Sequence, residues 1–208
     1  MPNHITNRLI VSGDDKRIAE FFEFIKGDNG AMDFNKVFPM PKELEIEDGS
    51  EGEWGKRYLD GDKDAIEKVD SWPESRKQKA LELGKAYIDN IREYGYPTWY
   101  GWACRNWGTK WNAYDIEVNF NEIRWNTAWN GVPNIVRALS KKFPDLHMEY
   151  AFADEDAGYN TGMGETYSEG GLYMTYPDGG TIDSFNIYFD LHPEDRERFR
   201  LVNGTYEY

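Results

Sequence analysis

The sequence predicts an α+β fold in which an antiparallel sheet carries two helices on one face. In several short segments apolar residues alternate with polar ones, which is the spacing of half-buried strands. In two segments between them apolar residues recur every three or four positions, as on an amphipathic helix. With 208 residues, 16% of them aromatic, the chain is long enough to bury a core without disulfides.

The first strand and the first helix are the clearest elements. In residues 4–11 the side chains of Ile5 and Leu9 fall on one face of the predicted strand. Asp14 follows a turn and has a side chain suited to an N-cap, which predicts a helix over residues 14–26.

The remaining elements of the same unit lie much further along the chain. Residues 115–120 and 123–129 alternate, and residues 121–122 predict a tight hairpin connection because Asn tolerates a positive φ. Residues 132–143 then have helical spacing, and residues 146–153 alternate again.

With residues 30–113 set aside as a large, partly helical insertion, the element order is β-α-β-β-α-β, the ferredoxin-like split unit. We therefore predict a single ferredoxin-like domain over 1–208, with a C-terminal strand extension over 157–208. Further alternation predicts extra antiparallel strands at residues 160–168, 171–177 and 181–189.

The insertion itself has weaker signals. Residues 47–55 are rich in glycine and acid, which predicts an exposed loop, and residues 62–69 predict a short helix. Residues 71–74 have the spacing of a capping box in front of a helix that continues to about Tyr94. Residues 98–113 show no clear period.

The charge is strongly negative and unevenly distributed. The chain has 38 acidic and 24 basic residues, a net charge of −14, of which residues 43–74 carry −8 and residues 149–197 carry −11. Such a surface disfavours direct binding to nucleic acid and to anionic membranes, since both need basic groups. The acidic segments predict either solvated loops or contact with a basic protein partner.

The inventory of reactive residues is small. Cys104 is the only cysteine, so the chain cannot form an internal disulfide. There is no phosphate-binding loop, nucleophile elbow or zinc-protease motif, so we expect no cofactor and no catalytic residue. The first residues lack the pattern of a signal peptide, and no apolar run is long enough to span a membrane, which predicts a cytoplasmic protein.

A tryptophan-rich block is the main candidate binding site. Indole rings stack on flat groups, and neighbouring cations bind anions, which predicts a pocket for a nucleotide or another flat anionic ligand, or for side chains of a partner. The alternative is that the rings pack against the sheet as core. The residues of this candidate site are Trp99, Trp102, Arg105, Asn106, Trp107, Lys110 and Trp111.

An acidic run offers a weaker candidate for a metal site. Carboxylates bind Mg²⁺ or Ca²⁺. Alternate residues of a strand share a face, so Asp154 and Asp156 are the members that could share an ion. The run lacks the spacing of an EF-hand, and the alternative is an acidic turn after a strand.

Three segments resemble the YubB-like, or Api-type, ferredoxin-like family of phage, plasmid and prophage proteins. They are the opening MPNHITNRL, the block WYGWACRNWGTKWNAYD at 99–115 and ADEDAGYN at 153–160, and the resemblance extends to about residue 170. It implies a ferredoxin-like domain from a mobile element or its bacterial host, and implies no activity. One departure is that Gly131-Val132-Pro133 stands where a proline pair is usual.

These observations favour a non-catalytic interaction protein of a mobile element, of the kind that acts as an acidic inhibitor or as a DNA-mimic-like partner of a host protein. The alternative is a binder of a small flat anionic ligand at the tryptophan block. A metal-dependent enzyme that uses the acidic run is a third hypothesis, and the oligomeric state is left open.

Overall fold

The structure is a computed structural model that describes residues 2–167 and 170–208. The chain forms two compact units: residues 1–39 with 106–208, here called unit 1, and residues 40–105, here called unit 2. No described helix is both long enough and apolar enough to cross a lipid bilayer.

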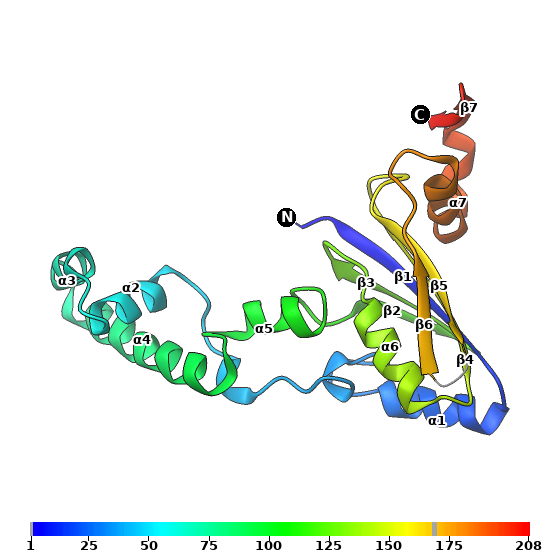
Figure 1. The fold of residues 1–208 in the computed structure, drawn as a ribbon. Coiled ribbons are helices and arrows are strands. Elements are labelled where there is room, and N and C mark those ends of the chain that lie inside the picture. Colours follow the sequence, from blue (N-terminus) through cyan, green and yellow to red (C-terminus); the bar gives the residue numbers. More distant parts are fainter. Residues whose placement is uncertain (1, 168–169) are drawn as a thin grey trace. The chain divides into compact units, whose positions relative to one another are not determined.

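Unit 1 is built on a six-stranded antiparallel sheet with the order β2-β3-β1-β4-β5-β6 (Figure 1). Its strands are β1 (His4–Ser12), β2 (Tyr114–Asn119), β3 (Glu122–Ala128), β4 (His147–Asp154), β5 (Thr161–Tyr167) and β6 (Gly171–Thr175). Its helices are α1 (Asp15–Ile25), η1 (Phe34–Lys36), α6 (Pro133–Lys142), α7 (Ile182–Leu191) and η4 (Pro193–Arg198), and a small hairpin, β7 (Arg200–Val202) with β8 (Thr205–Glu207), ends the chain.

The two faces of the sheet are covered differently. On one face Leu9, Ile123 and Met148 are fully buried, beneath the buried faces of α1 and α6. On the other face the small side chains Ala151 and Ala153 of β4 pack against α7. Alternate strand residues point to opposite faces, so α7 covers the side of the sheet that α1 and α6 leave open.

A buried polar network lies on the face of the sheet that α1 and α6 cover. The hydroxyl of Tyr150 donates to Oδ1 of Asn7 at 2.6 Å and accepts from the backbone N–H of Val132 at 2.6 Å. Nδ2 of Asn7 donates to the hydroxyl of Thr127 at 2.8 Å. Complete burial raises the pKa of Tyr150. The network connects β1, β3, β4 and the start of α6. Each of the polar groups named here has a hydrogen-bond partner within it.

Unit 2 consists of helices. They are η2 (Lys42–Leu44), α2 (Ser50–Leu59), α3 (Lys63–Asp70), α4 (Glu74–Tyr94) and α5 (Trp99–Asn106), whose last residue belongs to unit 1. α2 and α4 cross closely at Gly55 and Gly84, where an added Cβ would overlap the backbone of the opposite helix.

Trp107 packs within unit 1 near the two points where the chain leaves and rejoins this unit. Its indole Nε1 donates to the carbonyl of Phe38 at 2.9 Å, and its ring meets that of Phe34 edge to face, with centroids 5.9 Å apart. Trp107 is only 4% exposed, so it belongs to the core.

The antiparallel α+β prediction is confirmed, but two of the predicted segments have another structure. Residues 181–189 do not form a strand: Thr181 is the N-cap of α7 and the rest lie in this helix, with Phe185 and Phe189 buried against Phe199 and Tyr206 near the end of the chain. The predicted loop at 47–55 is wrong from Ser50 onward, where α2 begins, because packing against α4 outweighs its glycine content.

Two predicted turn signals are also wrong. The hairpin between β2 and β3 turns at residues 120–121, and Phe120 rather than Asn121 takes the positive φ, at +50°. Ser71 does not cap the following helix, since its hydroxyl donates to the carbonyl of Lys68 at 2.6 Å. The N-cap of α4 is instead Pro73, which has no capping side chain.

Candidate functional site

The open face of the sheet has a groove beneath α7, here called the acidic groove. It consists of two adjoining hollows of about 500 Å³ and 340 Å³, which share Ala151, Met163 and Thr175 as their common floor. The groove is lined by Arg8, Glu149, Ala151, Met163, Glu165, Tyr173, Thr175, Pro177, Asp183, Asn186, Ile187 and Asp190.

The register of the strands explains how these residues meet. Glu149 of β4, Glu165 of β5 and Tyr173 of β6 lie opposite one another in one row across the sheet. Ala151, Met163 and Thr175 form the next row. Side chains in such rows share a face and lie about 5 Å apart at Cβ, so the rows form a continuous surface.

α7 supplies the other wall. Asp183, Asn186 and Asp190 are spaced by three and four residues, which places them along one side of the helix. The C-terminal end of α7 is held by two arginines of the sheet. Arg8 forms an ion pair with Asp190, and Nη1 of Arg124 donates to the carbonyl of Leu191 at 3.2 Å. Cations at a helix C-terminus are favourable because they meet the negative end of the helix dipole.

The acidic groove carries an excess of negative charge. Four carboxylates, those of Glu149, Glu165, Asp183 and Asp190, face one guanidinium, that of Arg8, whose side chain is only 16% exposed and is paired with Asp190. Three carboxylates are thus left to attract cations from outside.

Glu149 of β4 and Glu165 of β5 lie directly opposite each other on adjacent strands and form a like-charge pair. Their side chains are 58% and 68% exposed, so water screens the repulsion but does not remove it. The imidazole of His147 lies close to both carboxylates, with its Nε2 3.9 Å from Glu149 and 3.7 Å from Glu165, beyond hydrogen-bond distance. Like charges at this position destabilise a sheet, so the pair costs stability in the free protein.

The predicted tryptophan block is divided between the two units. Trp99, Trp102 and Arg105 belong to unit 2, while Asn106, Trp107, Lys110 and Trp111 belong to unit 1. Within unit 2, Trp99 meets Tyr100 edge to face, with centroids 5.7 Å apart.

Lys110 and Trp111 do come together, with a third residue that the sequence did not single out. The Nζ of Lys110 lies 3.8 Å from the ring centre of Trp111 and 4.3 Å from that of Trp129. Both indoles are more than a third exposed, and Trp129 has a φ of +73°, a strained value for a tryptophan. In the sequence, the only indication that Trp129 could belong to this site was its position at the end of a predicted strand.

The candidate metal residues Asp154 and Asp156 are held by amide groups. Asp154 accepts from Nδ2 of Asn3 and from Nδ2 of Asn160, each at 3.0 Å, and from the backbone N–H of Asp156 at 3.0 Å. Nδ2 of Asn3 also lies 3.0 Å from Asp156. These bonds fix the turn between β4 and β5, and give the two carboxylates a structural role.

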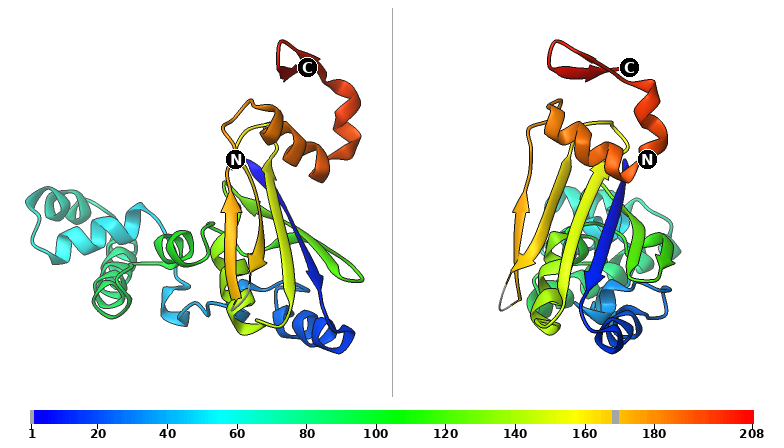
Figure 2. Two further views of the ribbon diagram at one scale, coloured as in Figure 1. Left: turned by 45° about the vertical axis from the view of Figure 1, so that its right-hand side comes forward. Right: turned by 90° about the vertical axis from the view of Figure 1, so that its right-hand side faces the viewer.

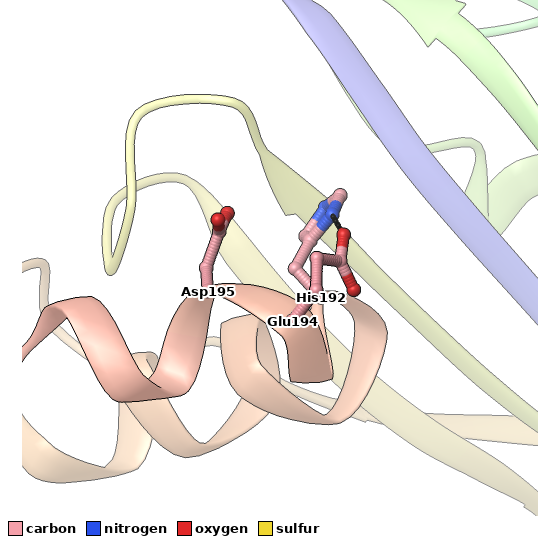
Figure 3. A group of neighbouring side chains, drawn as sticks. All are labelled: His192, Glu194 and Asp195. Carbon is pink, nitrogen blue, oxygen red and sulfur yellow. Dashed lines mark ion pairs between the residues drawn. The ribbon is translucent and has the colours of Figure 1, made fainter.

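One other group, His192, Glu194 and Asp195, has the donor types of a cation site (Figure 3). Among the described residues its three ligand atoms lie within 4.8 Å of one another. However, Asp195 already accepts from the hydroxyl of Tyr188 at 2.7 Å and pairs with Arg198 at 2.6 Å. Burial and this carboxylate raise the pKa of Tyr188, which keeps its hydroxyl protonated as the donor. These contacts favour a structural role for the three residues, at the junction of α7 and η4, over the binding of an ion.

Sequence reasoning missed the main residues of the acidic groove. Glu149 lies between the apolar residues Met148 and Tyr150, so the face of its strand on which it lies could be predicted from the pattern, whereas Glu165 has Gly164 and Thr166 as neighbours. The pairing of the two glutamates could not be predicted, because it depends on the register between β4 and β5. Asp183 was placed on a predicted strand at 181–189 instead of on a helix, and Asp190 lay just beyond that strand.

Comparison with known proteins finds a similarity to a ferredoxin-like domain over part of the chain, and no activity. No curated protein matches the sequence. A solved structure, the protein api92 from Yersinia pseudotuberculosis, is similar with a TM-score of 0.42 and 11% identity, over 86% of this chain and 99% of that one. Residues 106–200, from the point where unit 1 resumes to the start of β7, match the family model described as the ferredoxin-like domain in Api92-like protein.

Proposed function

We propose that the protein is a non-catalytic interaction protein that binds a basic segment of a partner protein in the acidic groove. The observation that carries the proposal is the pair Glu149 and Glu165, which lie directly opposite each other with more than half of each side chain exposed, and for which no described residue provides a hydrogen-bond donor within bonding distance. A partner cation placed between them would remove the repulsion, so binding would recover the stability that the pair costs.

The floor of the acidic groove suits the rest of a basic side chain. Met163, Ala151 and Ile187 are apolar, while the carboxylates stand at the rim. Lysine and arginine have long apolar stems that pack on such a floor while their charged heads meet acids. Phosphates of nucleic acid would be repelled by the same rim, so the groove favours a basic protein over DNA or RNA.

The family resemblance supplies the biological setting of the proposal. We infer a protein of a phage, plasmid or other mobile element that acts in the cytoplasm of a bacterial host. An acidic surface that occupies a basic site of a host protein would act as an inhibitor, in the manner of a DNA mimic. In this interpretation unit 1 is a β-α-β-β-α-β core to which β5, β6 and α7 add the groove, and residues 30–113 are an insertion in it.

The test is binding of a labelled basic peptide, acetyl-(Arg-Val)₃-amide, to the full chain at low and high salt. We expect binding that weakens with salt, and an affinity about 10-fold lower for the double variant Glu149→Gln/Glu165→Gln, which removes two charges from the groove. The matched control is Glu67→Gln/Glu82→Gln, which reduces the net negative charge by the same two units at exposed positions of unit 2. Equal losses in the two double variants would show that net charge alone attracts the peptide, and would refute the groove.

A second candidate function rests on Lys110, Trp111 and Trp129. Two half-exposed indoles around one ammonium could stack on a flat anionic ligand such as a nucleotide. Native mass spectrometry of protein purified from cells tests this: a bound anion that disappears in the variant Lys110→Ala supports the candidate. Protein that is always empty, and that gains no mass with added nucleotides, counts against it.

A further inference from the structure

The two edges of the sheet in unit 1 differ in a way that points to how a partner binds. β2 forms one edge and β6 the other (Figure 2). A free edge exposes backbone N–H and C=O groups, and natural proteins usually protect it with charges, prolines or bulges.

The β2 edge is protected. Its pairing with β3 shifts between Tyr114 and Glu117, and Asp115 within this bulge has a φ of +50°. Asp115 and Glu117 also place two negative charges along the strand. A bulge and repeated charge prevent another strand from adding here.

The β6 edge lacks each of these protections. Residues 171–175 pair with β5 in an unbroken register and contain no charged residue and no proline. No described strand pairs with the other side of β6, and none of the described backbone hydrogen bonds outside helices and strands involves residues 172–175. Tyr173 on this strand is 68% exposed.

We propose that the partner's basic segment binds as an added β-strand on β6, so that its alternate side chains enter the acidic groove. This inference rests on the proposed function and specifies the form of the partner. In an added strand, every second side chain would lie on the groove face, directly opposite Gly171, Tyr173 or Thr175.

The position opposite Tyr173 favours arginine. The row across the sheet would read Glu149, Glu165, Tyr173 and then the partner residue. Neighbouring strands are about 4.8 Å apart, so Glu165 would be about 10 Å from the backbone of the added strand. An arginine can cross this distance with its guanidinium over the ring of Tyr173 and end at the carboxylate of Glu165.

A second copy of the chain fits this edge less well. Two β6 strands paired antiparallel would bring two acidic grooves onto one continuous sheet face. The carboxylates of both grooves, such as Glu165 and Asp183, would then lie on one shared face with no added cation, which is unfavourable.

The experiment compares two peptides of equal charge on the full chain. One is acetyl-(Arg-Val)₃-amide, and the other has the same sequence with N-methylated valines, which cannot donate their backbone hydrogen bonds. Affinity is measured by fluorescence anisotropy, and protection of residues 171–175 by hydrogen exchange. We expect at least 10-fold weaker binding of the methylated peptide, and slower exchange of alternate β6 amides with the unmodified peptide only. The variant Tyr173→Ala should weaken binding, whereas Tyr208→Ala, at a residue that is 90% exposed, should not.

The outcomes separate this inference from the proposed function. Equal binding of both peptides without protection of β6 would overturn strand addition but leave binding in the acidic groove intact. Failure of both peptides to bind would contradict the proposed function, and the inference with it. A chain that is already dimeric, with β6 amides protected before any peptide is added, would assign the edge to a second copy and overturn the proposal.

Discussion

The substitution Tyr150→Phe removes one oxygen atom from the buried network of unit 1. Tyr150 is 1% exposed, and its hydroxyl accepts from the Val132 N–H and donates to the Asn7 Oδ1, each at 2.6 Å. Phenylalanine keeps the ring, so it leaves the stacking on Trp125 and the volume of the core nearly unchanged. The change therefore isolates the cost of leaving one buried donor and one buried acceptor without a partner.

The expected cost follows from these two groups. A buried polar group left without a partner costs about 1–3 kcal/mol, so the pair gives about 2–6 kcal/mol before relaxation. We expect about 3 kcal/mol, because Val132 lies at the start of α6, where the backbone can adjust. For a unit of this size the melting temperature should fall by roughly 6–12 °C.

The assay must report on unit 1, because the two units need not unfold together. Hydrogen exchange of peptides from β1 and β4, measured by mass spectrometry, gives the free energy of opening for this sheet alone. Tyr208→Phe, at a residue that is 90% exposed, is the control and should change nothing. A Tyr150→Phe protein within about 0.5 kcal/mol of wild type would refute the reasoning, since that is the range of neutral surface changes.

Three further predictions concern other parts of the chain. Glu165→Lys should raise the opening free energy of the sheet by about 0.2–1 kcal/mol, because it turns the pair with Glu149 into an attractive one, and should weaken basic-peptide binding by about 10-fold or more; unchanged binding would contradict the acidic groove. Gly55→Ala should disrupt unit 2, since its Cβ would overlap the backbone of Ala80, and near-native helical circular dichroism would show this crossing to be wrong. Phe120→Asn should stabilise the hairpin by about 1 kcal/mol, because asparagine tolerates the positive φ that phenylalanine resists; a lower melting temperature would oppose this.

The predictable elements were those whose environment is simple. β1 and α1 each bury one face and expose the other, so their periods of two and about three and a half residues are visible in the sequence. α7 is buried on several sides, against β4 and against Phe199 and Tyr206, so its apolar residues no longer mark a single stripe. Without that stripe, alternation along 181–189 predicted a strand.

The candidate site was harder to predict than the fold, since it depends on pairings between distant segments. The composition correctly located much of the negative charge in residues 149–197. It could not show that Glu149 and Glu165 lie opposite each other beside α7. The tryptophan block was treated as one site because it is continuous in sequence. The structure divides it, with Trp107 in the core and Trp111 at the surface beside Lys110. Continuity in sequence is a poor guide to proximity wherever a chain passes from one compact unit to another.

The bond from Trp107 to Phe38 has a consequence for how this chain tolerates rearrangement. Phe38 and Trp107 flank residues 40–105, and within unit 1 the indole Nε1 of Trp107 lies 2.9 Å from the carbonyl oxygen of Phe38. The ends left by excising that stretch would therefore already be neighbours. Domains accept insertions and deletions most readily where the two ends of the cut lie close together. A short glycine-serine bridge from Pro39 to Asn106 should therefore yield a smaller protein that retains the sheet, and the same junction is a natural place for a different stretch of sequence to be exchanged in.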